Sequence, residues 1–129
     1  MHRSEPRDHA ILRRRLRALI HDLRSLEKAT AVGKRSQRWT VRAPLAQQLR
    51  TLEQMDHDMT AIGLTRRVWS LGQATVPVLE ALAGKATRGN AAATEAAERT
   101  RSSLAAFERE LVLVAEGRDA SSAPGDSAT

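Results

Sequence analysis

Apolar residues recur along most of this chain in steps of three and four, the spacing that places side chains on one face of an α-helix. The first such stripe consists of five leucines: Leu12, Leu16, Leu19, Leu23 and Leu26. Pro6 or Asp8 is a suitable start for this helix, and Gly33 is a natural stop. A second stripe follows Pro44, a residue tolerated in the first turn of a helix, and ends before Gly63. Its members are Leu45, Leu49, Leu52, Met55, Met59 and Ile62. The pattern therefore predicts two successive helices.

A third stripe begins directly after Gly63 and consists of Leu64, Val68, Leu71, Thr75, Val78 and Leu82. The opposite face of the same segment is also apolar, through Trp69, Val76 and Leu79. Because Glu80 is the only charged residue between Val68 and Ala83, we expect this helix to be the central one. Pro77 has no N–H for the carbonyl of Gln73, which predicts a kink or a break.

The fourth stripe follows Asn90, which is a good N-cap residue, and closes at Gly117. Its members are Ala93, Ala97, Thr100, Leu104, Phe107, Leu111 and Val114. No strand alternation occurs along the chain. The sequence therefore predicts an all-α fold, an antiparallel four-helix bundle with a kinked third helix. We expect a flexible N-terminus over 1–8, a helical-bundle domain over 9–117 and a disordered C-terminal tail over 118–129.

Composition narrows the class of protein further. The chain has 129 residues, the size of one domain, and contains no cysteine. Disulfides, thiolate metal sites and cysteine nucleophiles are therefore excluded. No apolar run is long enough to cross a membrane, and the polar N-terminus does not resemble a secretory signal. These features predict a bacterial-type cytoplasmic protein.

Charge is distributed unevenly. Residues 1–50 hold thirteen of the 21 Lys and Arg residues but only four of the 15 Asp and Glu residues, a net charge of +9. On a helical wheel, the basic residues of the first helix fall in one arc opposite the leucine stripe, with His21 inside it. We call this set the basic arc: Arg13, Arg14, Arg17, Arg24 and Lys28. The segment that follows adds four more basic residues around Trp39, namely Lys34, Arg35, Arg38 and Arg42.

An arc of one sign favours an anionic partner. The fourth helix, by contrast, alternates signs at Glu95–Arg99 and Glu98–Arg101, as solvated helix faces usually do. We therefore expect a non-enzymatic interaction module whose basic arc and adjoining segment bind an acidic protein or a nucleic acid. In the nucleic-acid alternative, binding is phosphate-dominated and sequence-tolerant, and Trp39 stacks on a base. The structural alternative is that Trp39 anchors its segment to the bundle. A homo-oligomer is also compatible with the apolar third helix.

The segment His21-Asp22-Leu23-Arg24-Ser25 resembles the start of the phospho-acceptor box of sensor histidine kinases, and more loosely the corresponding motif of histidine phosphotransfer domains. Leu26 stands where the kinase box has proline, and Ser25 replaces the glycine of the phosphotransfer motif. The resemblance implies a phosphotransfer function in which His21 accepts the phosphoryl group, assisted by Asp22 or Arg24. We keep phosphotransfer as an alternative function. The simpler interpretation is that His21 is an exposed histidine that accepts no phosphoryl group.

The run Asp56-His57-Asp58 contains residue types that bind metals, but no second helix offers matching ligands. We therefore expect no metal, no cofactor and no enzymatic activity. Asp56 lies within the second apolar stripe, where a carboxylate requires a partner. An arginine at the edge of the first helix, such as Arg15, is one candidate and a partner subunit is another. The interpretation that we prefer is that Asp56 is a register-setting or partly exposed polar position.

Overall fold

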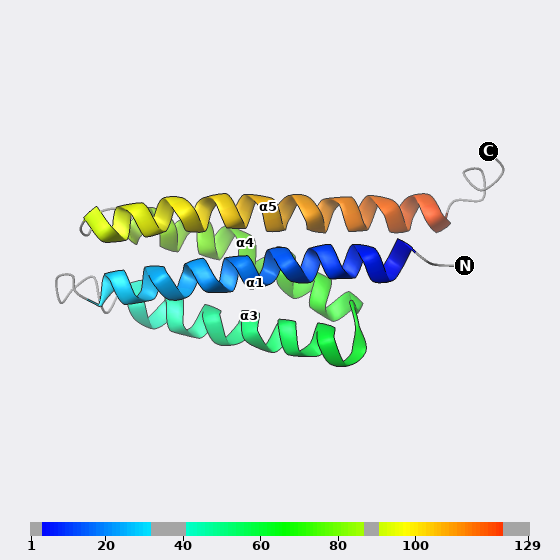
Figure 1. Cartoon of the computed structure of the whole chain (residues 1–129), viewed down its shortest axis with the longest axis horizontal. Coiled ribbons are helices and arrows are strands. Elements are labelled where there is room, and N and C mark those ends of the chain that lie inside the picture. Colours follow the sequence, from blue (N-terminus) through cyan, green and yellow to red (C-terminus); the bar gives the residue numbers. More distant parts are fainter. Residues whose placement is uncertain (1–3, 32–40, 87–90, 123–129) are drawn as a thin grey trace.

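The computed structural model describes the backbone of residues 4–31, 41–86 and 91–122, and the side chains of 10–31, 41–86 and 91–116. These ranges form four helices: α1 (Ser4–Thr30), α3 (Ala43–Ile62), α4 (Arg66–Ala86) and α5 (Ala91–Ser122) (Figure 1). Within the described residues every regular element is a helix, which confirms the all-α prediction.

The four helices pack side by side, and each runs opposite to the next along the chain (Figure 1). Substantial contacts join α1 to α3, α3 to α4, α4 to α5, and α5 back to α1. The helices therefore form a closed ring, with α1 diagonal to α4 and α3 diagonal to α5, as in a four-helix bundle. It follows that the outer face shared by α1 and α3 lies opposite the outer face shared by α4 and α5.

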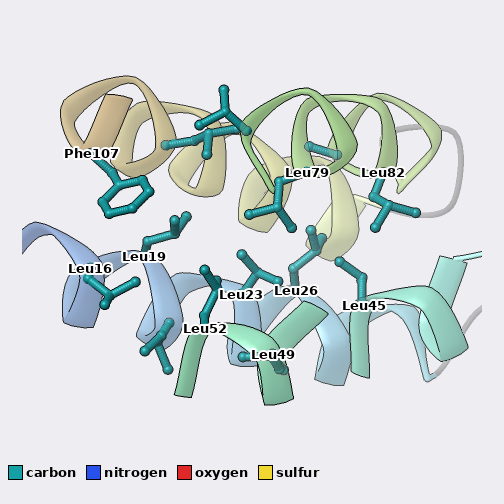
Figure 2. Packing of buried hydrophobic residues seen from close by; sticks show 14 of the residues in the cluster. Leu16, Leu19, Leu23, Leu26, Leu45, Leu49, Leu52, Leu79, Leu82 and Phe107 are labelled. Carbon is teal, nitrogen blue, oxygen red and sulfur yellow. The ribbon is translucent and has the colours of Figure 1, made fainter. Parts of the chain in front are cut away.

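The core is built mainly from leucines, as the first two stripes predict. All five leucines of the α1 stripe are at most 1% exposed. They pack against leucines of α3 and α4 and against Phe107 of α5 (Figure 2). Burying each such side chain contributes about 1.5–3 kcal/mol, so this cluster is the main source of stability. In the first two turns of α5 the buried residues are Ala93, Ala96 and Ala97, and these small side chains let α1 approach closely.

The turn between α3 and α4 depends on two residues. Gly63 has a φ of 85°, a left-handed conformation that favours glycine, and its N–H donates to the carbonyl of Met59 at 3.0 Å. The backbone N–H of Val68 donates to Oγ1 of Thr65 at 3.2 Å, so Thr65 caps the start of α4. The two stripes that adjoin Gly63 predict a short connection there, and the structure confirms it.

The predictions for the third helix need correction. α4 is continuous from Arg66 to Ala86 and contains Pro77, so it does not break there; the kink stays a prediction. The predicted central position is wrong, because α4 packs mainly on α3 and α5 and exposes its remaining surface. Val78 of the predicted stripe is 42% exposed, whereas Val76 and Leu79 are buried. A segment that is apolar on all sides does not specify which side faces the core.

Helix ends also differ from the prediction. α1 begins at Ser4, and α5 continues past Gly117 to Ser122, so the expected stop at Gly117 is wrong. Glycine disfavours a helix interior by only about 1 kcal/mol, which the rest of the helix can offset. Ile62, the last member of the second stripe, is 70% exposed at the end of α3. The mobility expected for 1–8 and 118–129 stays a prediction, and Asn90 lies outside the described residues.

Candidate anion-binding surface

Three arginines of the basic arc face α3, where they meet carboxylates. Arg17 Nε donates to both carboxylate oxygens of Asp56, at 3.1 and 3.2 Å. Arg13 Nε lies 3.8 Å from Oδ1 of the same aspartate, and Arg24 pairs with Glu53 one turn earlier on α3. The positive charge of the arc is therefore partly neutralised by carboxylates of α3 across the α1–α3 interface.

Asp56 is partly exposed, with 23% of its side chain accessible, as the preferred interpretation expects, but Arg15 is wrong as its candidate partner. Arg15 is exposed and makes no ion pair within the described residues, whereas Arg13 and Arg17 contact Asp56. The reason is helical phase: positions 13 and 17 are four apart and share the flank that faces α3, while position 15 points away from it. Arg17 and Arg24 are each 57% exposed in their side chains, so these pairs are solvent-screened and individually weak.

His21 lies in a shallow groove between α1 and α3. The groove is lined by Arg17, Ile20, His21, Arg24, Glu53 and Asp56. A phosphoryl group on His21 would lie near two guanidiniums and two carboxylates, and the carboxylates would repel it. Lys28 does not line this groove. Asp22, the other residue that the resemblance assigns an assisting role, instead accepts a hydrogen bond from Ser103 of α5. Phosphotransfer at His21 stays a prediction.

A second groove lies further along the same two helices, toward the ends joined by residues 32–40. It is lined by Arg24, Glu27, Lys28, Ala46, Leu49, Arg50 and Glu53. Lys28 and Arg50 are exposed, and within the described parts of the chain neither has a carboxylate at ion-pair distance. Lys28 belongs to the last turn of α1 and Arg42 precedes α3, which has no acidic residue in its first turn. Unpaired positive charge therefore gathers at this end of the α1–α3 pair.

We call the described part of this surface the loop-end basic site: Lys28, Arg42 and Arg50. The segment that joins Ala31 to Val41 carries Lys34, Arg35, Arg38 and Trp39 in its sequence, and these residues lie outside the described ranges. Arg14 is exposed but sits fourteen positions before Lys28 on α1, toward the opposite end of the bundle. The structure thus separates the arc into paired arginines, a distant Arg14 and the loop-end basic site.

Sequence reasoning missed Arg50 and the role of Glu53. The signal was available in part, because Glu53 and Asp56 are three positions apart on α3 and flank its buried stripe. Two carboxylates at that spacing suit basic residues on a neighbouring helix. The missing information was which helix lies beside α3, and a single stripe does not specify its neighbour.

The run Asp56-His57-Asp58 does not converge on one point. Asp56 faces α1, Asp58 accepts a hydrogen bond from Gln54 at 3.0 Å, and His57 is exposed. Across the described ranges, no three His, Asp or Glu side chains gather closely enough to hold a metal ion. Over the same ranges, no helix has the length and apolarity needed to span a membrane.

Comparison with known proteins supplies no further assignment: no family model matches the chain, and neither a curated protein nor a solved structure matches it.

Proposed function

We propose that this chain is a non-enzymatic interaction module that binds an acidic segment of a partner protein at the loop-end basic site. The observation that carries the proposal is the contrast within α1. Arg13, Arg17 and Arg24 are held by carboxylates of α3, whereas Lys28 and the nearby Arg50 form no ion pair within the described residues. Cations without an internal partner are the ones available to an external anion.

Carboxylates interspersed with the cations favour a protein over a nucleic acid. Glu27 and Glu53 line the same groove as Lys28 and Arg50. A nucleic-acid backbone presents closely spaced phosphates, so it would bring some of them near these carboxylates. An acidic peptide segment places its charges singly, and each can pair with one cation while avoiding the carboxylates.

The test uses three fluorescent probes of equal length: a Glu-rich peptide, its Gln-substituted analogue and a single-stranded oligonucleotide. We expect the Glu-rich peptide to bind at least about tenfold more tightly than the Gln analogue, because each close charge pair at an exposed site is worth up to about 1 kcal/mol. Lys28→Gln/Arg50→Gln should remove most of that difference. The control, Arg66→Gln/Arg67→Gln, removes the same charge from exposed positions at the opposite end of the α3–α4 pair. It should leave the difference in affinity between the two peptides unchanged. Equal binding of the two peptides would overturn the proposal.

The second candidate is sequence-tolerant nucleic-acid binding, which rests on Trp39 lying between Arg38 and Arg42 in the sequence. In a Trp69→Phe background, Trp39 is the only tryptophan, so its fluorescence reports on this segment alone. Quenching by the oligonucleotide, together with tighter binding of the oligonucleotide than of the Glu-rich peptide, would favour this candidate over the first.

A further inference from the structure

The face of the bundle opposite the basic arc carries a groove of different character. It runs between α4 and α5 and is lined by Gln73, Val76, Pro77, Glu80, Glu108, Leu111 and Val112. The α4 members recur in steps of three and four, so they form one strip along that helix. The α5 members do the same on the facing helix.

The floor of this groove is apolar. Val76 and Leu111 are buried beneath it, and Pro77 and Val112 are exposed, Val112 by 44%. The adjoining outer surface of α4 is also apolar and uncovered: Ala74, Val78 and Ala81 are all exposed. Exposed apolar residues that adjoin one another, with a polar rim, are typical of a surface that another protein covers.

The rim of the groove is acidic. Glu80 stands on the α4 side and Glu108 on the α5 side, and no Lys or Arg lines the groove. Within the described residues neither carboxylate forms an ion pair. The chain as a whole has a net charge of +6, so a groove whose charged lining residues are both carboxylates is a local reversal of its charge.

Pro77 removes one backbone hydrogen bond from α4 beside the groove. A proline has no N–H, so the carbonyl of Gln73, one turn earlier, receives no hydrogen bond from position 77. Both residues line the groove. The groove therefore offers an apolar floor and two carboxylates, which suit an occupant with apolar groups and basic side chains.

We propose that the α4–α5 groove is a docking site for a basic amphipathic helix of a partner protein. Apolar side chains on one face of that helix cover Pro77 and Val112, and its flanking Lys or Arg residues pair with Glu80 and Glu108. This is the helix-in-groove mode of recognition, in which apolar anchors provide affinity and the charged rim provides orientation. The proposal stands independently of the loop-end basic site, which lies on the other side of the bundle.

A second copy of this chain is a poorer occupant. Its most basic helical surface, the arc of α1, offers little apolar surface to cover the floor, because Ile20 between Arg17 and Arg24 is buried. A symmetric contact between two α4–α5 faces would bring carboxylates of the two copies together, which is destabilising. Charge and apolarity together therefore favour a different, basic partner.

The probe for this site is a synthetic helical peptide with leucines at helical spacing flanked by lysines, labelled with fluorescein. Its control peptide keeps the leucines and replaces every lysine with glutamate. We expect the Lys peptide to bind at micromolar concentration and the Glu peptide to bind at least about tenfold more weakly. The backbone amide shifts that the Lys peptide perturbs should map to Gln73–Glu80 and Glu108–Val112.

Two variants localise the effect. Glu80→Gln/Glu108→Gln should weaken binding of the Lys peptide about tenfold, since both rim charges are lost. The matched control, Glu95→Gln/Glu98→Gln, removes the same charge from exposed positions near the start of α5 and should leave binding unchanged. Circular dichroism of each variant confirms that it is folded.

Three results would each overturn the proposal. The first is equal binding of the two peptides, and the second is no binding of the Lys peptide when the protein is in 100-fold excess over the labelled peptide. The third is equal weakening of binding by both double variants. A concentration-dependent dimer that Glu80→Gln/Glu108→Gln abolishes would also overturn it, because the occupant would then be a second copy.

Discussion

Arg17 Nε lies 3.1 Å from Oδ1 of Asp56, so a side chain of the basic arc on α1 is held by a carboxylate of α3 that is 39 positions away in sequence. This contact gives the arginines of the basic arc a structural role. Its arginines serve partly to join two helices of the bundle, and the residues that remain for an external anion are fewer and lie nearer to one end.

We expect Asp56→Asn to lower the free energy of unfolding by about 1 kcal/mol, and Glu53→Gln to change it by less than about 0.5 kcal/mol. The Asp56 side chain is 23% exposed and faces two guanidiniums, including that of Arg13, whose Nε is buried without a hydrogen bond. Glu53 is 42% exposed, more than Asp56, and it pairs with one arginine rather than two. Urea denaturation measures both changes. A larger loss for Glu53→Gln would contradict this ranking.

The same substitution at two glycines of α4 should have different effects. A Cβ at Gly84 would meet only Nη2 of Arg101, the far end of a flexible side chain, at 3.2 Å. Gly84→Ala should therefore stabilise the protein by about 0.5–1 kcal/mol through helix propensity. A Cβ at Gly72 would meet Leu111 Cδ1 at 3.2 Å and Phe107 Cζ at 3.3 Å, and both side chains are buried.

Gly72→Ala should accordingly show no gain, because crowding in the α4–α5 interface offsets the propensity term. Thermal unfolding of the two variants side by side provides the comparison. If Gly72→Ala raised stability as much as Gly84→Ala, the close packing of α4 against α5 at Gly72 would be contradicted.

Ser103→Ala should destabilise the protein by about 1 kcal/mol, since it removes the hydrogen bond that Ser103 donates to the carboxylate of Asp22 between α5 and α1. Ser102→Ala is the matched control, because Ser102 is an exposed neighbour on the same helix. Chemical denaturation of both variants distinguishes a specific interhelical contact from a general effect of replacing serine in α5. Similar values for the two would show that the contact with Asp22 contributes nothing measurable.

Incubation with a small phosphodonor should leave the intact mass of the protein unchanged. Glu53 and Asp56 line the groove that holds His21, and they disfavour a phosphoryl group there. A phosphoryl-sized mass gain that is acid-labile and absent from His21→Gln would establish the phosphotransfer alternative instead.

Much of the fold could be predicted because amphipathic stripes report burial directly. The leucines of α1 and the alanine-to-valine stripe of α5 each have one apolar face, and every member of both is buried. The prediction of the buried face of α4 was wrong because this helix is apolar on more than one face. Val78 and Val76 are equally apolar, so their positions in the sequence gave no basis for choosing which one faces the core.

The candidate site was less predictable than the fold, because it depends on which helices are neighbours. Arg17 and Lys28 are equivalent on a helical wheel of α1, yet Arg17 faces Asp56 and Lys28 has no such partner within the described residues. That difference arises from α3, and from the position of its acidic residues along the shared interface. The acid-rimmed groove has the same origin, since it requires α4 and α5 to be adjacent.

The central claim is that an acidic segment of a partner protein binds at the loop-end basic site, Lys28, Arg42 and Arg50, and a salt titration tests it most directly. The affinity for the Glu-rich peptide would be measured over a range of salt concentrations, with wild type, Lys28→Gln/Arg50→Gln and the control Arg66→Gln/Arg67→Gln. We expect affinity to fall steeply with salt for wild type and for the control, and less steeply for Lys28→Gln/Arg50→Gln, because fewer charge pairs are then screened. A flat response in wild type, or the same slope in all three proteins, would contradict the account.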